Sequence, residues 1–364
     1  MVFILITLPI TLLFISIGFG QLYFSIKLKK KFPEEHVFIN SFIVFVLWII
    51  TGILYPFFYP RDNEYVKEYV IFHQSFSMNV ICIFAPLLVL LILLYQSKIV
   101  LKDKPELREN RTITKFLEKY DLINVNQINN KSYSLRTDFH RKIFHLLPGL
   151  IIIVLRIFAI NIWEGLWNAD QVYGITGVEY AMFLILTIGY TGVILFAALD
   201  FVRLSFVFEK SNIYSLLPDC LSNLLIKTLK RNENYEFTKN TVLVLSLVPM
   251  LFLPFGIFTA AALITSIGDG VASIMGVSFG RYHFPKKSSK TIIGYISGFL
   301  ASFGVSLFAL WLFEGEIIPF KMIIMSLSGA LVFLIIDLLS LKIDDNILNP
   351  IFCGLIMLFF YIIL

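Results

Sequence analysis

One carboxylate stands out in this chain because it interrupts an apolar stretch that is long enough to cross a membrane twice. Asp269 is the single charged residue of 241–280, and Gly268 and Gly270 flank it. A carboxylate inside such a stretch is costly unless it meets a cation or water, so it is a candidate functional group. Cations and a hydroxyl follow shortly after it, at Arg281, Lys286, Lys287, Lys290 and Thr291. A carboxylate for Mg²⁺, several cations and small residues that permit close approach would together suit the triphosphate of a nucleotide.

Small residues recur around this carboxylate at a helical spacing. Every fourth position from 268 onward is glycine or alanine, namely Gly268, Ala272, Gly276 and Gly280. This spacing is typical of two helices in close contact, so packing explains the small residues without explaining the acid. The same run, with Gly270 and Ser273, is a candidate nucleotide-binding segment. It matches no standard nucleotide motif, because GxxxxGK[ST] is absent and GxGxxG fails at residue 273.

A second polar cluster precedes an apolar run in the middle of the chain. It reads Asp138-Phe-His140-Arg141-Lys142-Ile-Phe-His145 and holds two of the five histidines of the chain. On a helix, Arg141 and His145 share a face, and Asp138 lies about one turn back. The cluster is either a charged collar at the start of a membrane helix or part of a functional site.

Two further groups of acids lie at the ends of apolar runs. Asp200 and Arg203 have the spacing of an ion pair on one helix, for which a structural role is favoured. Asp337 lies inside a later run, and Asp344-Asp345-Asn346 follows it. These acids are either solvated, or they complete a metal site with Asp269, since Mg²⁺ is typically held by one or two carboxylates together with phosphate oxygens.

The elements that carry these residues are expected to be membrane-spanning helices. Hydrophobic residues make up 58% and charged residues 15% of the chain, and the mean hydropathy is +0.82. Charge-free runs of membrane length occur at 2–26, 37–60, 74–97, 180–199, 291–313 and 347–364. The runs are continuously apolar and do not alternate, which favours helices over a barrel. We expect an all-α polytopic transmembrane helix bundle of about ten spans.

Loop charges predict how this bundle is oriented. Basic and acidic loops alternate if there are ten spans with both termini outside. The positive-inside rule then assigns five loops to the cytoplasm, namely 27–36, 98–142, 203–239, 281–290 and 342–346. The four polar clusters therefore lie at or near one membrane face. The longest basic loop is expected to contain a short amphipathic helix with Ile113, Phe116 and Tyr120 at the interface.

Composition also excludes several other classes of protein. The first apolar run lacks preceding cations, so it is not a typical secretory signal. The three cysteines are far apart, which argues against a disulfide framework or a zinc site. The modest net charge of +5 reflects loop asymmetry and indicates no nucleic-acid partner. We divide the chain into a three-span region (1–97), a basic cytoplasmic loop (98–142) and a seven-span catalytic region (143–364).

Part of the sequence resembles the polyprenol kinase family, which includes dolichol kinase, phytol kinase and the CTP-dependent diacylglycerol kinase of fungi and is related to phosphatidate cytidylyltransferases. The run Gly268-Asp269-Gly270-Val-Ala272-Ser273 with Gly276, Gly280, Lys290-Thr291 and Gly294 is similar to the CTP-binding segment of that family. Arg141-Lys142-Ile-Phe-His145 is similar to its upstream Arg-Lys-x-x-His element, and Asp200-x-x-Arg203 and Asp345-Asn346 fall where the family carries polar residues. The resemblance covers 138–364.

One departure from the family pattern affects the expected site. The family usually reads Lys-[Ser/Thr]-x-Glu-Gly, whereas this chain has Ile293 at the glutamate position. The role of that glutamate therefore passes to another acid, or the activity is altered. The His-Gly-Gly and Asp-Arg elements of the cytidylyltransferases are absent, which favours a kinase.

The resemblance implies that the protein uses CTP to phosphorylate the hydroxyl of a membrane lipid alcohol. Dolichol is the leading substrate, and its product would be dolichyl phosphate for the synthesis of glycan-carrier lipids. The resemblance also implies Mg²⁺ at Asp269 with Asp345. The triphosphate would lie on Lys286, Lys287, Lys290, Thr291 and the glycine-rich run. Arg141 and Lys142 would stabilise the transferring phosphate, and His145 or an acid would accept the hydroxyl proton. The site would face the cytoplasm, from the endoplasmic reticulum membrane of a eukaryote or the cell membrane of a prokaryote.

Other functions stay open on the sequence alone. Phytol or diacylglycerol is an alternative substrate within the same family. An ion-coupled transporter is an alternative of a different class, because ten spans, Pro249, Pro254 and the intramembrane acids Asp269 and Asp337 would suit a carrier. A scaffold without catalysis is a third alternative, which the missing family glutamate keeps open.

Overall fold

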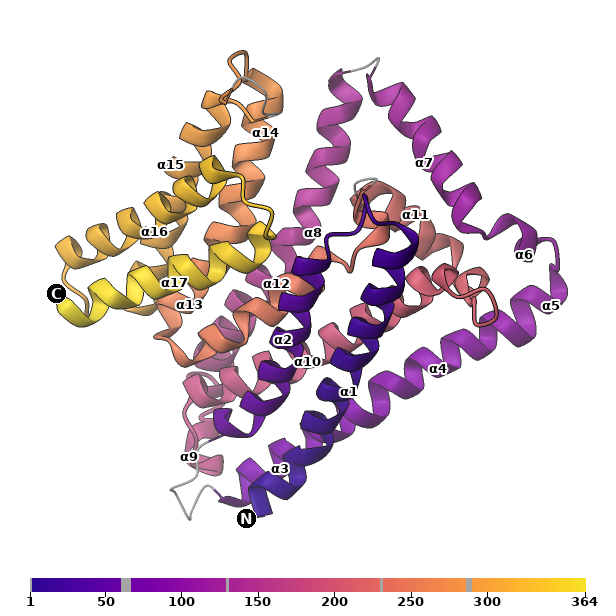
Figure 1. Ribbon diagram of the computed structural model, residues 1–364. Coiled ribbons are helices and arrows are strands. Elements are labelled where there is room, and N and C mark those ends of the chain that lie inside the picture. Colours follow the sequence, from indigo (N-terminus) through magenta and orange to yellow (C-terminus); the bar gives the residue numbers. More distant parts are fainter. Residues whose placement is uncertain (1, 60–66, 129–130, 230–231, 286–289) are drawn as a thin grey trace. The chain divides into compact units, whose positions relative to one another are not determined.

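The computed structural model describes residues 2–59, 67–128, 131–229, 232–285 and 290–364 (Figure 1). The structure is 84% helical and contains no strand in these ranges. An isolated antiparallel bridge joins His283 and Thr291. The predicted all-α class is confirmed.

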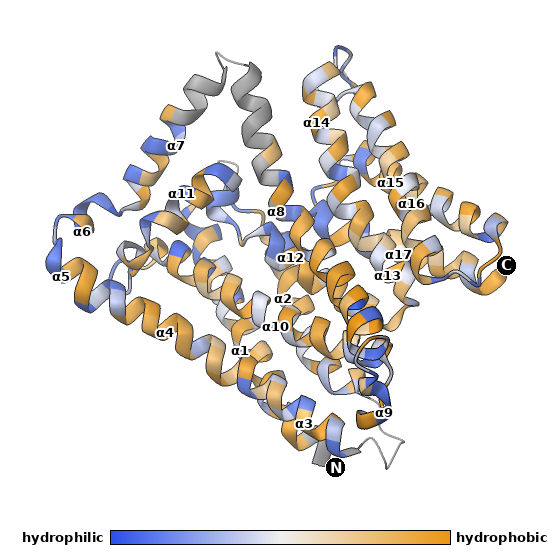
Figure 2. Ribbon diagram, turned by 180° about the vertical axis from the view of Figure 1, so that it is seen from behind, coloured by the Kyte–Doolittle hydropathy of each residue, from blue (hydrophilic) through white to orange (hydrophobic). Residues whose placement is uncertain are grey.

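Nine helices among the described residues are long and apolar enough to cross a membrane. They are Leu5–Lys31, Phe38–Phe58, Glu68–Asp103, His145–Glu164, Gly177–Val207, Phe255–Phe279, Ile292–Phe313, Pro319–Leu339 and Asp345–Ile363. With the shorter apolar helix Lys239–Phe252, they confirm a polytopic bundle of about ten spans. The chain is therefore a multi-pass membrane protein. Figure 2 shows apolar residues along the long helices and polar residues mostly at their ends and in the short connecting helices.

The shorter helix differs from the expectation that 241–280 forms two full spans. It consists of α12 (Lys239–Leu247) and the 3₁₀ turn η8 (Pro249–Phe252). Proline lacks the amide hydrogen that would continue the α-helical ladder, so Pro249 ends α12 and tightens the backbone into the 3₁₀ turn. At about 1.5 Å per residue, this segment is shorter than the hydrocarbon core of a bilayer.

The chain forms two compact units that interleave along the sequence. Unit 1 comprises Met1–Tyr120, Ile151–Ile226 and Lys230–Thr241. Unit 2 comprises Asp121–Leu150, Lys227–Leu229 and Val242–Leu364. The division predicted from the sequence follows chain order and groups residues by expected function, whereas these units group residues by packing.

The spans of unit 1 pack through large aromatic side chains. Its long helices are α1 (Val2–Lys31), α2 (Phe38–Leu54), α3 (Lys67–Met78), α4 (Ala85–Tyr95) and α10 (Gly177–Leu204). Phe14 of α1 lies with its ring centroid 4.7 Å from that of Tyr190 in α10 and 5.1 Å from that of Trp48 in α2. All three side chains are fully buried, so they form the centre of this unit.

Shorter helical segments lie within the spans of unit 1 and between them. They include the π turns η2 (Asn79–Phe84), η3 (Gln96–Val100) and η4 (Phe158–Glu164), the 3₁₀ turns η1 (Tyr55–Phe58), η5 (Ser205–Val207), η6 (Tyr214–Leu216) and η7 (Asn232–Tyr235), and the helices α5 (Leu101–Asp103), α6 (Leu107–Asn110), α9 (Ala169–Tyr173) and α11 (Asp219–Thr228). The helix α7 (Ile113–Ile128), which belongs to unit 1 as far as Tyr120, confirms the predicted helix in 98–142, with Phe116 and Tyr120 buried.

Unit 2 holds the C-terminal helices in chain order, each against its neighbour. They are α13 (Phe255–Leu263), the π turn η9 (Ile264–Gly268), α14 (Asp269–Phe279), α15 (Ile292–Phe313), α16 (Pro319–Leu339) and α17 (Asp345–Ile363). The first part of α8 (Lys131–Ile157), as far as Leu150, belongs to the same unit. Successive helices α14, α15, α16 and α17 lie side by side (Figure 1). This arrangement brings together the middle of α8, the starts of α14 and α17 and the last turn of α16, where the candidate residues lie.

Candidate functional site

An ion pair joins two helices that are distant in the sequence. The Lys142 ammonium of α8 donates a short hydrogen bond to the Asp269 carboxylate of α14. The Lys142 side chain is 10% exposed and that of Asp269 is 29% exposed. Gly270 faces this contact, since a Cβ there would lie 3.8 Å from the Cβ of Lys142. The acid inside the apolar stretch therefore meets a cation, as its position requires.

The backbone immediately before Asp269 is a π turn. The turn η9 (Ile264–Gly268) separates α13 from α14, and Asp269 is the first residue of α14. Such turns add a residue to the helix and are frequent at functional sites. Apolar periodicity carries no signal for this turn, so the sequence did not predict it.

A second ion pair lies in the same unit. Lys290 Nζ donates to Asp337 Oδ1 at 2.5 Å and to the Asp337 main-chain oxygen at 2.9 Å. Asp337 lies in the last turn of α16, where carbonyl oxygens lack helical partners and a cation is favourable. The side chains of Lys290 and Asp337 are 37% and 15% exposed.

Two more ionisable residues lie close to these pairs. Asp345, the first residue of α17, is within electrostatic range of both Asp269 and Asp337, and His145 of α8 is within range of Asp269. We name as the acid–cation cluster the six residues Lys142, His145, Asp269, Lys290, Asp337 and Asp345. The structure thus brings together residues from three of the four polar groups of the sequence, namely those around Asp269, around Lys142 and around Asp337, and leaves out Asp200 and Arg203.

The neighbouring Asp344 has a local role. Its Oδ1 accepts hydrogen bonds from the Asn346 main-chain nitrogen at 2.9 Å and from Asn346 Nδ2 at 2.8 Å. Asp344 thereby caps the N-terminus of α17. The two neighbouring acids therefore differ: Asp344 caps the helix, whereas Asp345 lies within electrostatic range of Asp269 and Asp337 and accepts from Asn346 Nδ2 at 3.2 Å.

The predicted close contact between helices is confirmed. The small residues along α14 and at its two ends lie against α15 and its N-cap in antiparallel register, in the pairs Gly268 with Ser302, Ala272 with Gly298, Gly276 with Gly294, and Gly280 with Thr291. A Cβ on Gly298 would lie 2.7 Å from the Ala272 Cβ, so this position has no room for a side chain. Packing accounts for Gly268, Gly276 and Gly280, and their assignment to a nucleotide rests on the family resemblance alone.

The threonine of the predicted nucleotide segment also has a structural partner. Thr291 is 5% exposed and is the N-cap of α15, where its Oγ1 accepts a hydrogen bond from the Gly294 nitrogen at 3.2 Å. Ser273 is half-buried on α14. Ile293, at the family's glutamate position, lies in the exposed first turn of α15.

Several predicted site residues fall outside the described part of the structure. Lys286 and Lys287 lie outside the described residues. The chain on either side of them is joined by hydrogen bonds from Phe284 N to Lys290 O at 3.1 Å and from Ile292 N to Tyr282 O at 3.0 Å. Arg141 belongs to α8, but its side chain also lies outside the described part.

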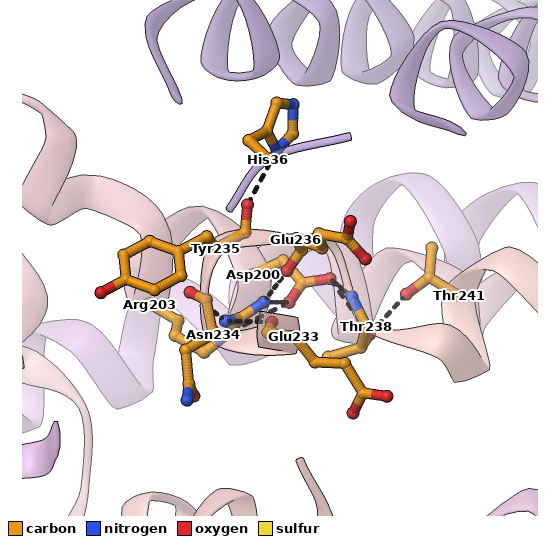
Figure 3. A network of polar contacts seen from close by, with 9 residues as sticks. All are labelled: His36, Asp200, Arg203, Glu233, Asn234, Tyr235, Glu236, Thr238 and Thr241. Carbon is orange, nitrogen blue, oxygen red and sulfur yellow. Dashed lines mark hydrogen bonds and ion pairs between the residues drawn. The ribbon is translucent and has the colours of Figure 1, made fainter. Parts of the chain in front are cut away.

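The pair Asp200 and Arg203 lies in unit 1 and is fully buried. Figure 3 shows the network of polar contacts around it. Arg203 donates to Asp200 Oδ1 at 2.9 Å, and the other Asp200 oxygen accepts from the Thr238 nitrogen at 2.8 Å and hydroxyl at 3.0 Å. The guanidinium also donates to the main-chain oxygens of Glu233, Asn234 and Glu236. The carboxylate and the guanidinium both find their partners inside the protein, which confirms the favoured structural role: the pair holds 233–238 against α10.

No preformed metal cage exists among the described residues, because no three His, Cys, Asp or Glu side chains come together to hold an ion. Mg²⁺ does not need three protein side chains, since it is commonly held by one or two carboxylates, with waters and substrate phosphates as the other ligands. Asp269 and Asp345, which lie within electrostatic range of each other, have the right chemistry for this mode of binding.

Comparison with known proteins finds no matching family model, no matching curated protein and no matching solved structure. The chemistry of the site is therefore argued from the residues of this chain.

Proposed function

We propose that this protein is a CTP-dependent kinase that phosphorylates the hydroxyl of a membrane lipid alcohol, with dolichol or a similar polyprenol as the substrate. The acid–cation cluster of unit 2 is the observation that carries the proposal. The alcohol cannot leave the bilayer and the nucleotide cannot enter it, so the site must lie where spans reach the membrane surface. Phosphoryl transfer depends mainly on positioning and on neutralising oxygen charge, for which this cluster supplies both signs of charge.

An apolar groove beside the cluster supports a lipid substrate. It lies between α16 and α17, has a volume of about 470 Å³ and is lined by apolar side chains that include Ile336, Leu341 and Leu348. Ile336 precedes Asp337 in the chain, and Leu348 is one helical turn beyond Asp345. A hydrocarbon chain in this groove would bring its hydroxyl end close to these two acids.

The proposed roles follow from charge. Asp269 with Asp345 would hold Mg²⁺, which would neutralise phosphate oxygens when bound with the nucleotide. Lys290, with Lys286 and Lys287, would bind the triphosphate, and Lys142 with Arg141 would stabilise the transferring group. Lys142 and Lys290 now pair with carboxylates, and both could turn to phosphate oxygens on nucleotide binding. His145 or a carboxylate would accept the hydroxyl proton.

The basic loops support a cytoplasmic orientation of this site under the positive-inside rule. We propose that the protein lies in the endoplasmic reticulum membrane of a eukaryote or the cell membrane of a prokaryote. Its product, a lipid phosphate such as dolichyl phosphate, would enter lipid metabolism as a carrier for glycans in protein glycosylation.

The proposal is tested with purified protein in lipid nanodiscs. Mg²⁺ and each of the four γ-labelled nucleoside triphosphates are added with dolichol, phytol, geranylgeraniol or diacylglycerol. We expect labelled lipid phosphate with CTP and a polyprenol. Transfer to phytol or diacylglycerol instead would reassign the substrate, and no transfer with any combination would refute the kinase.

An ion-coupled carrier is the second candidate, because carboxylates within membrane spans that pair with cations are also typical of ion pathways. The pairs Lys142–Asp269 and Lys290–Asp337 favour it, whereas the gathering of charge at one end of the helices does not. Solute flux into proteoliposomes that requires Asp269, without CTP turnover, would establish the carrier. Nucleotide binding without flux or turnover would indicate a scaffold.

A further inference from the structure

A polar cavity in unit 1 is separate from the acid–cation cluster, which belongs to unit 2. The cavity has a volume of about 230 Å³ and lies between the start of α7, the turn η6 and α11. Its polar lining includes Arg111, Lys115, Lys119, Tyr214, Asp219 and Asn223. All of these residues belong to unit 1.

The described lining carries more positive than negative charge. Arg111 is neutralised by Asp219, to whose two carboxylate oxygens it donates at 3.1 and 2.9 Å. Lys115 donates to Asn110 Oδ1 at 2.6 Å, and Lys119 donates to Asn223 Oδ1 at 2.7 Å. These amide oxygens carry no charge, and the single carboxylate of the described lining, Asp219, is shared by Arg111 and Lys119, so the lining keeps a net positive charge that favours an anion.

A buried hydroxyl belongs to one of the residues that line the same cavity. Tyr214 is 3% exposed, and no described residue forms a hydrogen bond with its Oη. Its ring is held by edge contacts with Phe116 and Phe206. Burial raises the pKa of Tyr214, partly offset by the charge of Arg203, so the hydroxyl keeps its proton and can donate it. Buried polar groups are normally paired, so this donor points to a ligand.

An apolar groove adjoins the cavity. It has a volume of about 350 Å³ and lies between α4 and α10, both of which belong to predicted spans. Leu217 lines the groove and the cavity alike. Gly192 of α10 faces open space here, because nothing lies within 4 Å of the position of a Cβ.

The two spaces have the arrangement of a lipid site at a membrane surface. Arg111 donates to Gln96 at 3.0 Å and to the main-chain oxygen of Ser215 at 3.4 Å, so the cavity lies near the C-terminal ends of the spans Glu68–Asp103 and Gly177–Val207. Lipid headgroups lie at such helix ends, and basic pockets between spans bind anionic headgroups.

We propose that unit 1 binds an anionic lipid, with its phosphate in the cavity and a hydrocarbon chain in the groove. Lys115, Lys119 and Tyr214 donate to the phosphate oxygens. The adjoining groove favours a lipid over a free anion, which would need only the cavity. This site does not depend on the kinase proposal.

The test uses the full chain purified in a neutral detergent. Binding of dioctanoyl phosphatidic acid, dioctanoyl phosphatidylcholine and glycerol 3-phosphate is measured by native mass spectrometry and by the shift in thermal unfolding. We expect wild-type protein to bind phosphatidic acid at one molecule per chain, and to bind the other two at least about tenfold more weakly.

Variants separate the cavity from the groove. We expect Lys115→Gln with Lys119→Gln to weaken phosphatidic acid binding at least about tenfold, and Tyr214→Phe to weaken it about threefold while keeping the ring contacts. Gly192→Leu places a side chain in the groove and should also weaken the binding of phosphatidic acid. The matched control, Lys30→Gln with Lys102→Gln, removes two exposed charges outside the cavity and should bind as wild type.

Three results would overturn the proposal. If the Lys115/Lys119 variant and the Lys30/Lys102 control lost phosphatidic acid binding equally, the lipid would be held by nonspecific attraction to a basic surface. Glycerol 3-phosphate binding as tightly as phosphatidic acid, and unaffected by Gly192→Leu, would mean a site for a soluble anion. Absence of phosphatidic acid binding to the wild type would mean no site.

Discussion

Lys142 and Asp269 are 127 residues apart in the sequence and form an ion pair between α8 and α14. The pair joins the part of the chain that resembles the upstream kinase element to the glycine-rich run. It also explains how a carboxylate persists next to a π turn inside a membrane span, because the lysine offsets the cost of the charge.

Removing one partner of this pair should destabilise the protein more than removing both. We expect Asp269→Asn or Lys142→Gln to lower the free energy of unfolding by about 1–3 kcal/mol, since each leaves a mostly buried charge alone. The double variant should recover much of this loss. The stability of the two single variants and the double variant is measured by thermal unfolding in detergent. If the losses of the single variants add up in the double variant, the two residues do not interact.

The buried ion pair of Asp200 and Arg203 in unit 1 should contribute to the stability of the protein and not to its proposed activity. Asp200→Asn leaves the Arg203 guanidinium uncompensated, so we expect a loss of about 3–5 kcal/mol. The control Asp219→Asn removes an acid that is 63% exposed, and Arg111, although 9% exposed, keeps its hydrogen bonds to Gln96 and Ser215, so we expect a smaller loss of about 1 kcal/mol. The unfolding of the two variants is compared in one detergent. Equal losses of stability would contradict the structural role of Asp200 and Arg203 in holding 233–238 against α10.

Two glycines of α15 should respond in opposite directions to alanine. Gly298→Ala pushes a methyl group against Ala272 and should destabilise the protein by about 1–3 kcal/mol. Gly304→Ala meets nothing within 4 Å and should stabilise it by up to about 1 kcal/mol through helix propensity. The measurement is the midpoint of thermal unfolding, and a stabilising Gly298→Ala would contradict the close packing of α14 and α15.

Stability should fall in mild acid because of His36, which lies between the first two spans. Its Nδ1 donates to the Tyr235 main-chain oxygen at 2.9 Å, and its side chain is buried. Burial lowers the pKa of His36 below 6.5, opposed in part by the hydrogen bond to Tyr235. The unfolded chain therefore takes up the proton first, and stability is lost as the pH falls from about 6.5 toward the folded pKa.

The check is the unfolding midpoint of wild type and His36→Gln between pH 7.5 and about 5. The variant should show a flatter pH dependence in this window. An identical slope in both proteins would assign the effect to other groups.

The sequence predicted the fold well where apolar runs carry the signal. The spans and the all-α class followed from charge-free length. The exceptions were Lys239–Phe252, which Pro249 shortens, and α8, which begins at Lys131 ahead of its apolar part. Hydropathy detects the membrane portion of a helix, and the polar turns before it carry no comparable signal.

The candidate site was predictable only in part. Asp269 was identified because a charge in an apolar run is conspicuous, and the small residues predicted a close helix contact. Lys142 and Lys290 were identified as candidate cations, but the acid with which each lysine pairs was not predicted. Contacts between residues so far apart in the sequence depend on tertiary packing. The cavity around Tyr214 left no signal, since neither a buried hydroxyl nor an empty space can be seen in a single sequence.

The central claim is tested most directly by the transfer of the labelled γ-phosphate of CTP to dolichol in nanodiscs with Mg²⁺. The comparison is between wild type, Asp269→Asn and Asp103→Asn, a control that removes an exposed acid of α5. We predict transfer by wild type and the control, and a loss of at least about a hundredfold in Asp269→Asn. Transfer at the wild-type rate by a folded Asp269→Asn protein would contradict the proposed site, and no transfer by the wild type to any lipid alcohol would contradict the proposed function.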